Sequence, residues 1–149
     1  MSKNEHEYNV DLQWKEGRVG TLRSPDLDEE IEVATPPDFD GGVEGIWSPE
    51  HLFLSSVSSC FMTTFVAIAE YSKLDFEDLQ VAAVAKLGKK DGKFLVSEIT
   101  LKPELVIENE KYTDKARRIM EKAEEACLIT RSIKTEIIFD PTVTVGAVL

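Results

Sequence analysis

The hydrophobic pattern of the chain is dominated by one stretch, Leu52 to Ala69, in which apolar residues mix with Ser and Thr and no charged side chain occurs. Just before it stand Ser48, Pro49 and Glu50, which suit the N-cap, the first helical position and the positive end of a helix dipole. These signals predict a helix from Ser48 to Tyr71. Because apolar residues occupy all of its faces, we expect the helix to be buried on all sides and to form the centre of the fold.

Short alternating patterns upstream of this helix predict β-strands. In Tyr8 to Trp14 apolar and polar residues alternate, which indicates a half-buried strand, and Val19 to Arg23 can pair back on it as a hairpin. A third strand is expected at Glu30 to Ala34. The Pro- and Gly-rich segment Thr35 to Trp47 is typical of a loop that leads into the helix.

Two further strands are expected after the helix, at Leu79 to Leu87 and Phe94 to Ile107. They are joined by Gly88 to Lys93, a polar segment that contains the hairpin signal Asp91-Gly92. Pro103 lies inside the second of these strands. Because proline cannot donate a ladder hydrogen bond, we expect a β-bulge or an edge position there.

The last third of the chain carries a second helix and one more strand. Between Lys111 and Cys127 the apolar residues recur at helical spacing and form one stripe, with charged residues on the opposite face. Lys134 to Phe139 predicts the final strand. Helices and strands alternate irregularly and no repeat or linker interrupts them, so we expect a single α+β domain spanning residues 1–149.

Charge and cysteine content narrow the function. The 149 residues carry a formal net charge of −11, which repels phosphate backbones, so nucleic acid is not an expected partner. The first residues lack the apolar core of a signal peptide, and two cysteines without such a peptide are typical of a reducing compartment; we therefore expect the cytoplasm. The central helix reaches the minimum length of a membrane span, but its Ser and Thr content and acidic flanks favour a core helix.

The chemistry of the chain centres on its two cysteines. Cys60 lies in the middle of the central helix and Cys127 on the stripe of the second helix, so both thiols are expected to face the core. Inert packing is one interpretation, because free cysteine is among the most buried residue types. Reactive chemistry is the other, and it needs a cation, since an apolar site raises the pKa of a thiol. Zinc is not expected, because the His and Cys residues show no ligand spacing.

Two arginines in the N-terminal region are candidates for that cation. Arg18 stands between glycines in Gly17-Arg18-Val19-Gly20. Arg23 follows in the same region, as the last residue of the strand predicted at Val19 to Arg23. A buried arginine needs a carboxylate, and Glu50 in the first turn of the central helix is the candidate partner. On spacing alone, a solvated turn residue is the alternative interpretation of Arg18.

Two segments resemble the OsmC/Ohr family of thiol-dependent hydroperoxide reductases: GGVEGIWSPEHLFLSSVSSCF and, further along, CLITRS. That family has a Gly-rich loop, a helix start of the form N/S/T-P-E-[EQH]-L and then a cysteine, and Glu50 and Cys60 keep its spacing. The Gly-Arg-x-Gly of the family is similar to Gly17-Arg18-Val19-Gly20. The resemblance extends from Tyr8 to Phe139.

The resemblance implies an OsmC/Ohr-like fold in which antiparallel sheets wrap the long buried central helices of an intertwined homodimer, with two active sites at the subunit interface. In such a protein Cys60 is the peroxidatic cysteine and Cys127 is the resolving cysteine. Arg18, held by Glu50, would stabilise the Cys60 thiolate and orient the peroxide.

The implied reaction is the reduction of an organic hydroperoxide, with hydrogen peroxide as a poorer substrate. The thiolate cleaves the O–O bond and becomes a sulfenic acid, which condenses with the second thiol to a disulfide. No cofactor is required, but an external dithiol must reduce the disulfide, and in relatives this is often a lipoyl protein. Apolar side chains are expected to bind the substrate in a pocket formed by Phe53, Phe61 and Met62.

One feature departs from the family pattern. Many members place proline directly after the second cysteine, whereas here Leu128 follows Cys127, which leaves open whether the Cys60–Cys127 disulfide forms. Trp47 and His51 have no role that the pattern assigns. The alternative function is a non-catalytic dimer that binds an apolar small molecule and keeps its thiols inert, and a chaperone-like surface is a third.

Overall fold

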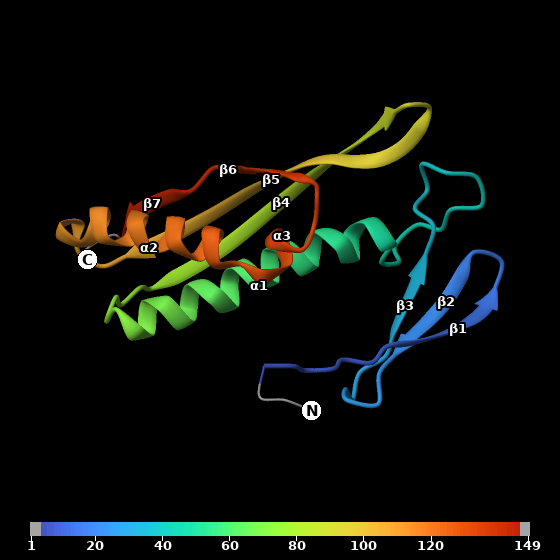
Figure 1. Ribbon diagram of the computed structural model, residues 1–149, viewed down its shortest axis with the longest axis horizontal. Helices are drawn as coiled ribbons and strands as arrows, with labels where there is room; N and C mark the ends of the chain where they lie inside the picture. The colour runs from blue at the N-terminus through green and yellow to red at the C-terminus, as the bar shows by residue number, and fades with distance from the viewer. Residues whose placement is uncertain (1–3, 147–149) are drawn as a thin grey trace. The chain divides into compact units, whose positions relative to one another are not determined.

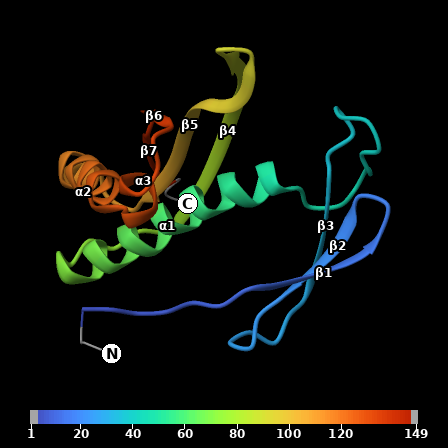
Figure 2. The ribbon, with the colours of Figure 1, turned by 45° about the vertical axis from the view of Figure 1, so that its right-hand side comes forward.

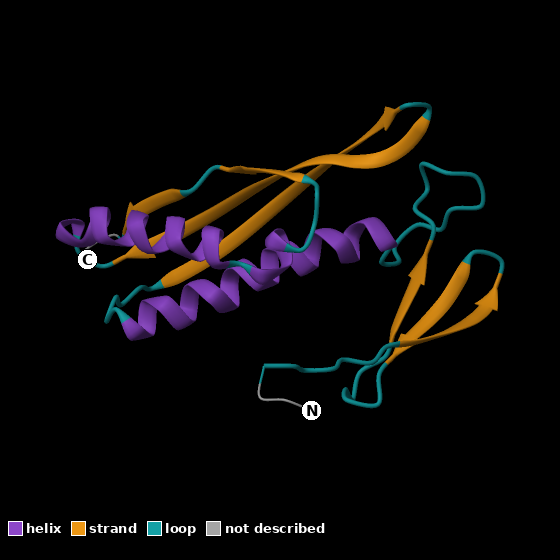
Figure 3. Cartoon of the chain, in the orientation of Figure 1, coloured by secondary structure: helices purple, strands orange, loops and turns teal. Residues whose placement is uncertain are grey.

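The computed structural model describes residues 4–146, which form two compact units that divide between Phe53 and Leu54. The first unit holds a small sheet and its loops. The second holds most of the long helix, a larger sheet and the remaining helices (Figures 1 and 3). The α+β class is therefore confirmed, while a single domain over residues 1–149 stays a prediction.

The first unit is built on an antiparallel sheet in the order β1-β2-β3, with strands Asp11–Glu16, Val19–Arg23 and Ile31–Ala34. Gly17 opens the β1–β2 turn with a φ of 51°, which glycine adopts without steric penalty. The predicted hairpin and third strand are confirmed. Strand β1 begins later than expected because its ladder with β2 starts at the pair Asp11–Arg23, and Arg23 is the last residue of β2.

The apolar face of β1 is not covered by its own unit. The alternating residues that predicted a half-buried strand are between 63% and 85% exposed: Tyr8, Val10, Leu12 and Trp14. The alternation is therefore present, but the burial that we expected from it is absent within the first unit. A row of exposed apolar side chains of this kind marks an interaction surface.

The loop between β3 and α1 folds tightly on itself. The N–H of Gly42 donates to the Phe39 carbonyl oxygen (3.0 Å), and the N–H of Val43 donates to the Thr35 carbonyl oxygen (2.9 Å). A Cβ atom on Gly42 would overlap the carbonyl oxygen of Pro36, so only glycine fits there. The Gly-rich composition of this loop thus follows from close backbone packing.

Helix α1, Pro49–Tyr71, is the long helix that the apolar stretch predicts. Ser48 caps it, because its hydroxyl accepts a hydrogen bond from the N–H of His51 (3.1 Å). Only one stripe of the helix is fully buried, at a spacing of four residues: Val57, Phe61, Phe65 and Ala69. The expected burial on all sides is wrong for the chain by itself, since a single sheet can cover only one face of a helix.

The second unit contains a mixed sheet of strands β4 (Asp78–Lys90), β5 (Lys93–Ile107), β6 (Glu136–Phe139) and β7 (Thr142–Val145). Strands β4 and β5 form the predicted hairpin, closed by Asp91 and Gly92, whose φ angles of 53° and 77° are those of a type I′ turn. Both β6 and β7 run parallel to β5, so this sheet is mixed, whereas the sheet of the first unit is antiparallel throughout. The helices between β5 and β6 supply the long crossover that parallel pairing requires. Strand β7 was not expected.

Pro103 lies in the interior strand β5 and not on an edge strand. Strand β6 pairs with residues 98–101 of β5 and β7 pairs with residues 104–107, so Pro103 falls in the gap between them. Its missing N–H therefore costs the sheet no bond on that side. The β4–β5 irregularity lies elsewhere, between Lys86 and Leu87, so the predicted bulge at Pro103 is also wrong.

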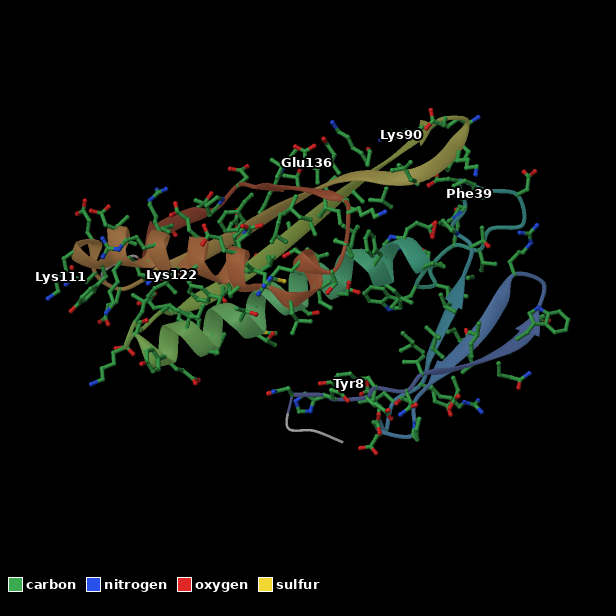
Figure 4. The ribbon with its side chains drawn as sticks, in the orientation of Figure 1. Tyr8, Phe39, Lys90, Lys111, Lys122 and Glu136 are labelled. Carbon is green, nitrogen blue, oxygen red and sulfur yellow. The ribbon has the colours of Figure 1, made fainter. Side chains whose placement is uncertain are left out.

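The second helical region begins with a 3-10 turn, η1 (Glu110–Tyr112), and continues as α2 (Thr113–Ala126) and α3 (Leu128–Arg131). The predicted stripe of α2 is confirmed at Ala116, Ile119, Met120 and Ala123, which are buried. Alternate residues of β5 face the same core, with Ile99, Leu101 and Leu105 fully buried. Helices α1 and α2 lie on this face of the sheet (Figures 1 and 2). Lys122 on the charged side of α2 and Lys111 in η1 are exposed (Figure 4).

Candidate functional site

Cys60 lies on α1 directly before Phe61, a residue of the buried stripe, and its side chain is half-buried. The Thr64 hydroxyl, one helical turn further on, lies 3.9 Å from the Cys60 sulfur. The Cys60 carbonyl oxygen accepts a separate hydrogen bond from the Thr63 hydroxyl (3.2 Å). The thiol thus stands at the border of the core, within reach of a hydroxyl donor.

Cys127 does not continue α2, as the apolar stripe predicted, but joins α2 to α3. Its φ of −64° and ψ of 113° are extended, and its side chain is 1% exposed. Its carbonyl oxygen accepts hydrogen bonds from the Thr130 hydroxyl (3.0 Å) and from the Arg131 N–H (3.2 Å). These two bonds begin the short helix α3.

The structure brings the two thiols together within the second unit. Burial raises the pKa of Cys60, but hydrogen bonds to its sulfur from the N–H of Ile129, the Cys127 side chain, the Thr64 hydroxyl and the N–H of Leu128 lower it below the ordinary thiol value. No ionised side chain of the described residues 54–146 is among these contacts. The sulfur of Cys60 is therefore stabilised as an anion by neutral donors.

The pKa of Cys127 moves in the opposite direction. Burial raises it most, and the hydrogen bond and charge interaction with Cys60 raise it further, while the N–H and hydroxyl of Thr130 lower it in part. Of the two thiols, Cys60 is therefore the one that loses its proton more readily. A partly exposed thiol of lowered pKa beside a second thiol is the arrangement of redox-active cysteines.

The predicted cation and its carboxylate belong to the first unit. Arg18 is exposed on the β1–β2 turn, with its side chain against Gly41, and Arg23 pairs with Glu30 (3.4 Å). Glu50 is half-buried in the first turn of α1, and no Arg18–Glu50 ion pair forms among residues 4–146. Their roles toward Cys60 stay predictions.

The three predicted substrate-binding residues have different surroundings. Phe61 is fully buried, with its ring 6.1 Å from that of Phe65 and 5.6 Å from that of Phe139. Met62 is 41% exposed, and Phe53 is half-buried at the end of the first unit. A substrate role for these three residues stays a prediction. A cavity of about 730 Å³ in the first unit is lined instead by residues that include the apolar Val10, Leu22, Leu27, Ile31 and Leu52.

Sequence reasoning missed three of the groups that contact Cys60. Thr64 follows it by one helical turn and so occupies the same face of α1, a signal that the sequence contains. The N–H groups of Leu128 and Ile129 become donors only because the chain turns back at Cys127, which the helical stripe does not reveal. Metal-binding clusters of His, Cys, Asp and Glu are absent from the part of the chain that the structure describes.

Trp47 and His51 form part of the α1 cap. The Nδ1 atom of His51 lies 2.6 Å from the buried Ser48 hydroxyl, and its ring meets the Trp47 ring edge-on at a centroid distance of 6.3 Å. These contacts stabilise the start of α1 and give Trp47 and His51 a structural role. By length and composition alone α1 could cross a membrane, but core helices of soluble proteins pass the same test, so this is weak evidence.

Comparisons with known proteins identify the family of the chain. Residues 41–142 match the family described as OsmC-like protein. The chain is 29% identical over 138 residues to YmaD of Bacillus subtilis (strain 168), an uncharacterized protein, and the match covers 89% of this chain and 90% of YmaD.

Solved structures show the same fold. An OsmC-like protein of unknown function from Vibrio cholerae superposes with a TM-score of 0.84 at 25% identity, covering 92% of this chain and 99% of that one. An organic hydroperoxide resistance protein from Elizabethkingia anophelis superposes with a TM-score of 0.76 at 23% identity, covering 97% and 100% of the two chains. Given the matched family, the shared fold and the paired thiols, the chain belongs to the OsmC-like family and has the α+β fold of OsmC and Ohr proteins.

Proposed function

We propose that this protein reduces organic hydroperoxides, with Cys60 as the peroxidatic cysteine and Cys127 as the resolving cysteine. The observation that carries the proposal is the unequal thiol pair: the pKa of Cys60 is lowered and that of Cys127 is raised, mainly by burial, while Cys127 also donates a hydrogen bond to Cys60. Membership in the OsmC-like family and solved relatives named organic hydroperoxide resistance proteins support it.

The first step is the attack of the Cys60 thiolate on the terminal oxygen of the hydroperoxide. An S–O bond forms and the O–O bond breaks, so the peroxide is reduced to an alcohol and Cys60 is oxidised to a sulfenic acid. The leaving alkoxide takes up one proton. Arg18, positioned by Glu50, orients the peroxide and adds a positive charge near the reacting oxygen. Phe53 and Met62 contribute apolar surface for its organic part, whereas the fully buried Phe61 packs in the core.

The second step joins the two sulfurs. The Cys127 sulfur attacks the Cys60 sulfur, an S–S bond forms, the S–O bond breaks and water leaves. An external dithiol, for which a lipoyl protein is the candidate, then donates two electrons and two protons to restore both thiols. Cys127 is ready for this step because the structure already holds it in hydrogen-bond contact with Cys60.

A homodimer in the cytoplasm completes the proposal. Supporting observations are the uncovered apolar face of β1 and the single buried stripe of α1, which leaves side chains such as Met62 exposed on its other faces. A second copy would remove both surfaces from water. Analytical ultracentrifugation should therefore give twice the mass of the chain, and a monomer at micromolar concentration would contradict this part of the proposal.

The test of the activity uses reduced protein with a dithiol and an aryl or fatty-acid hydroperoxide. We expect catalytic consumption of the peroxide, complete loss of it in Cys60→Ser, and loss of multiple turnover in Cys127→Ser. Wild-type protein that consumes no organic hydroperoxide and no hydrogen peroxide under these conditions refutes the proposal.

A non-catalytic protein that binds an apolar small molecule is a second candidate, favoured by the cavity of about 730 Å³ in the first unit. The two candidates differ in their thiols. Rapid alkylation of Cys60 at neutral pH supports the enzyme, whereas two thiols that react only after unfolding support the binding protein.

A further inference from the structure

The open cavity of about 730 Å³ in the first unit lies beside the turn that joins β2 to β3. Its volume falls within the range of about 300 to 1,000 Å³ that is typical of small-molecule sites. The two cysteines and the residues proposed to bind the peroxide are not among its lining residues in the part of the chain that the structure describes. The apolar part of the lining is formed by Val10, Leu22, Leu27, Ile31 and Leu52.

Much of this apolar wall is in contact with water. Val10 is 68% exposed, Leu27 is 67% exposed and Ile31 is 36% exposed. An apolar body that lies against these side chains removes their surface from water, which is the main source of affinity in sites of this kind.

The turn that carries Leu27 is held in place by its own hydrogen bonds. The Ser24 hydroxyl donates to the Asn9 carbonyl oxygen (2.6 Å) and accepts from the N–H of Asp26 (3.1 Å). The N–H of Leu27 donates to the Ser24 carbonyl oxygen (3.2 Å). The wall of the cavity is therefore formed before any ligand binds.

The charged groups that line the cavity do not balance. Arg23 is in an ion pair with Glu30, with its Nε atom 3.4 Å from the carboxylate, so its charge is offset. Asp28 and Glu29 are exposed, and neither takes part in an ion pair among residues 4–146. Residues 24–72 contain no Lys or Arg. The polar edge of the cavity therefore carries an excess of negative charge.

We propose that this cavity binds a small amphiphile with a cationic head, whose apolar part lies against the leucine wall and whose head lies beside Asp28 and Glu29. The inference goes beyond peroxide reduction, because it involves neither thiol. The apolar wall supplies the affinity, and charge complementarity selects the head. A carboxylate head is disfavoured at the same place, since like charges repel.

A second cavity of the first unit has the opposite charge. It measures about 260 Å³, and its lining includes Leu12, Trp14 and Arg18. Arg18 takes part in no ion pair among residues 4–146, so this cavity favours an anionic head. The two cavities predict opposite preferences, and a test must show which of them each probe enters.

The experiment titrates the full-length reduced protein with three probes that share one chain length: decyltrimethylammonium, decanol and decanoate, each below the concentration at which it forms micelles. Calorimetry measures the affinity, and methyl NMR locates the probe through the signals of Leu22, Leu27 and Ile31. At these residues the ammonium probe should bind about tenfold more tightly than decanoate or more, because two exposed carboxylates attract one head and repel the other.

Paired variants test the two parts of the site. Asp28→Asn with Glu29→Gln should remove most of the preference for the ammonium probe, whereas Asp38→Asn with Asp40→Asn removes the same charge from the β3–α1 loop and should preserve it. Leu27→Ala should weaken binding of the ammonium probe and decanol alike by about threefold to tenfold, because both lose the same apolar contact. Circular dichroism shows that each variant is folded.

Equal affinity for the ammonium and carboxylate probes overturns the proposal, as does a preference that survives Asp28→Asn with Glu29→Gln or the binding of no probe at all. If the probe reaches Leu27 only as a homodimer dissociates, measured by ultracentrifugation, a second copy of the chain occupies the cavity and the proposal is wrong. The titration uses no peroxide, so a protein that reduces no hydroperoxide can still bind the probe. An active enzyme that binds no probe loses only this inference.

Discussion

Replacing Phe61 with alanine tests whether the residue beside Cys60 acts through the core or through the substrate. Its side chain is fully buried and its ring contacts those of Phe65 and Phe139, at centroid distances of 6.1 Å and 5.6 Å. Truncating a buried phenylalanine to alanine costs about 3 to 5 kcal/mol, which includes the loss of ring contacts and the cavity that remains. A typical domain has only about 5 to 15 kcal/mol of stability, so the variant should unfold at a much lower urea concentration.

The assay is urea unfolding followed by far-ultraviolet circular dichroism, because the second unit contains most of the helical residues, whereas Trp14 and Trp47 both report on the first unit. Met62→Ala is the matched control. Its side chain is 41% exposed, and we expect a loss of about 1 kcal/mol or less. If Phe61→Ala lowers the free energy of unfolding by less than about 1 kcal/mol but weakens organic hydroperoxide binding, the core assignment is refuted.

Three further predictions concern the thiol pair, the cation and the loop. The alkylation rate of Cys60 should rise with pH and level off below the ordinary thiol pKa, because hydrogen bonds lower the pKa of Cys60. The alkylation rate of Cys127 should rise only above the ordinary thiol pKa, because burial raises the pKa of Cys127. Peptide mapping of protein alkylated at several pH values measures the two cysteines separately. Arg18→Ala should raise the pKa of Cys60 and slow its reaction with peroxide by about 10²-fold or more in stopped-flow measurements, and an unchanged rate would indicate Arg23 or another cation. Gly42→Ala should destabilise the first unit by more than about 1 kcal/mol, measured by tryptophan fluorescence, because its Cβ would overlap the Pro36 carbonyl oxygen. Gly88→Ala should be tolerated, since its Cβ would meet only the Ser97 hydroxyl at 3.9 Å; this variant is followed by circular dichroism, because Gly88 lies in the second unit.

Local signals in the sequence were sufficient for most of the elements. Ser48 and Pro49 mark the start of α1. Asp91-Gly92 is a preferred pair for a two-residue hairpin turn, and it closes the β4–β5 hairpin. The spacing of apolar residues also identifies the buried face of α2 correctly. These features depend on neighbouring residues alone.

Features that depend on distant parts of the chain were not predictable in this way. The parallel strand β7 and the position of Pro103 between two partner strands follow from sheet topology, which no local pattern contains. The uncovered faces of β1 and α1 show the same limit, since apolar residues predict burial but do not identify what covers them.

The sequence predicted the two cysteines of the candidate site but not the groups that donate hydrogen bonds to Cys60. Cys127 was placed toward the core from the apolar stripe of its helix and Cys60 from the apolar character of the central helix, and the two thiols lie close together in the structure. The donors at Leu128 and Ile129 could not be predicted, because a helical stripe through Cys127 hides the break that turns their N–H groups toward Cys60.

The account depends most on Cys60 being oxidised by peroxide and then captured by Cys127. The direct measurement is the intact mass of reduced protein treated with one equivalent of an organic hydroperoxide and then alkylated under denaturing conditions. We predict a loss of two hydrogens with no alkyl group added, and in Cys60→Ser one alkyl group on Cys127 with no oxidation. Wild-type protein that carries two alkyl groups after this treatment would contradict the account.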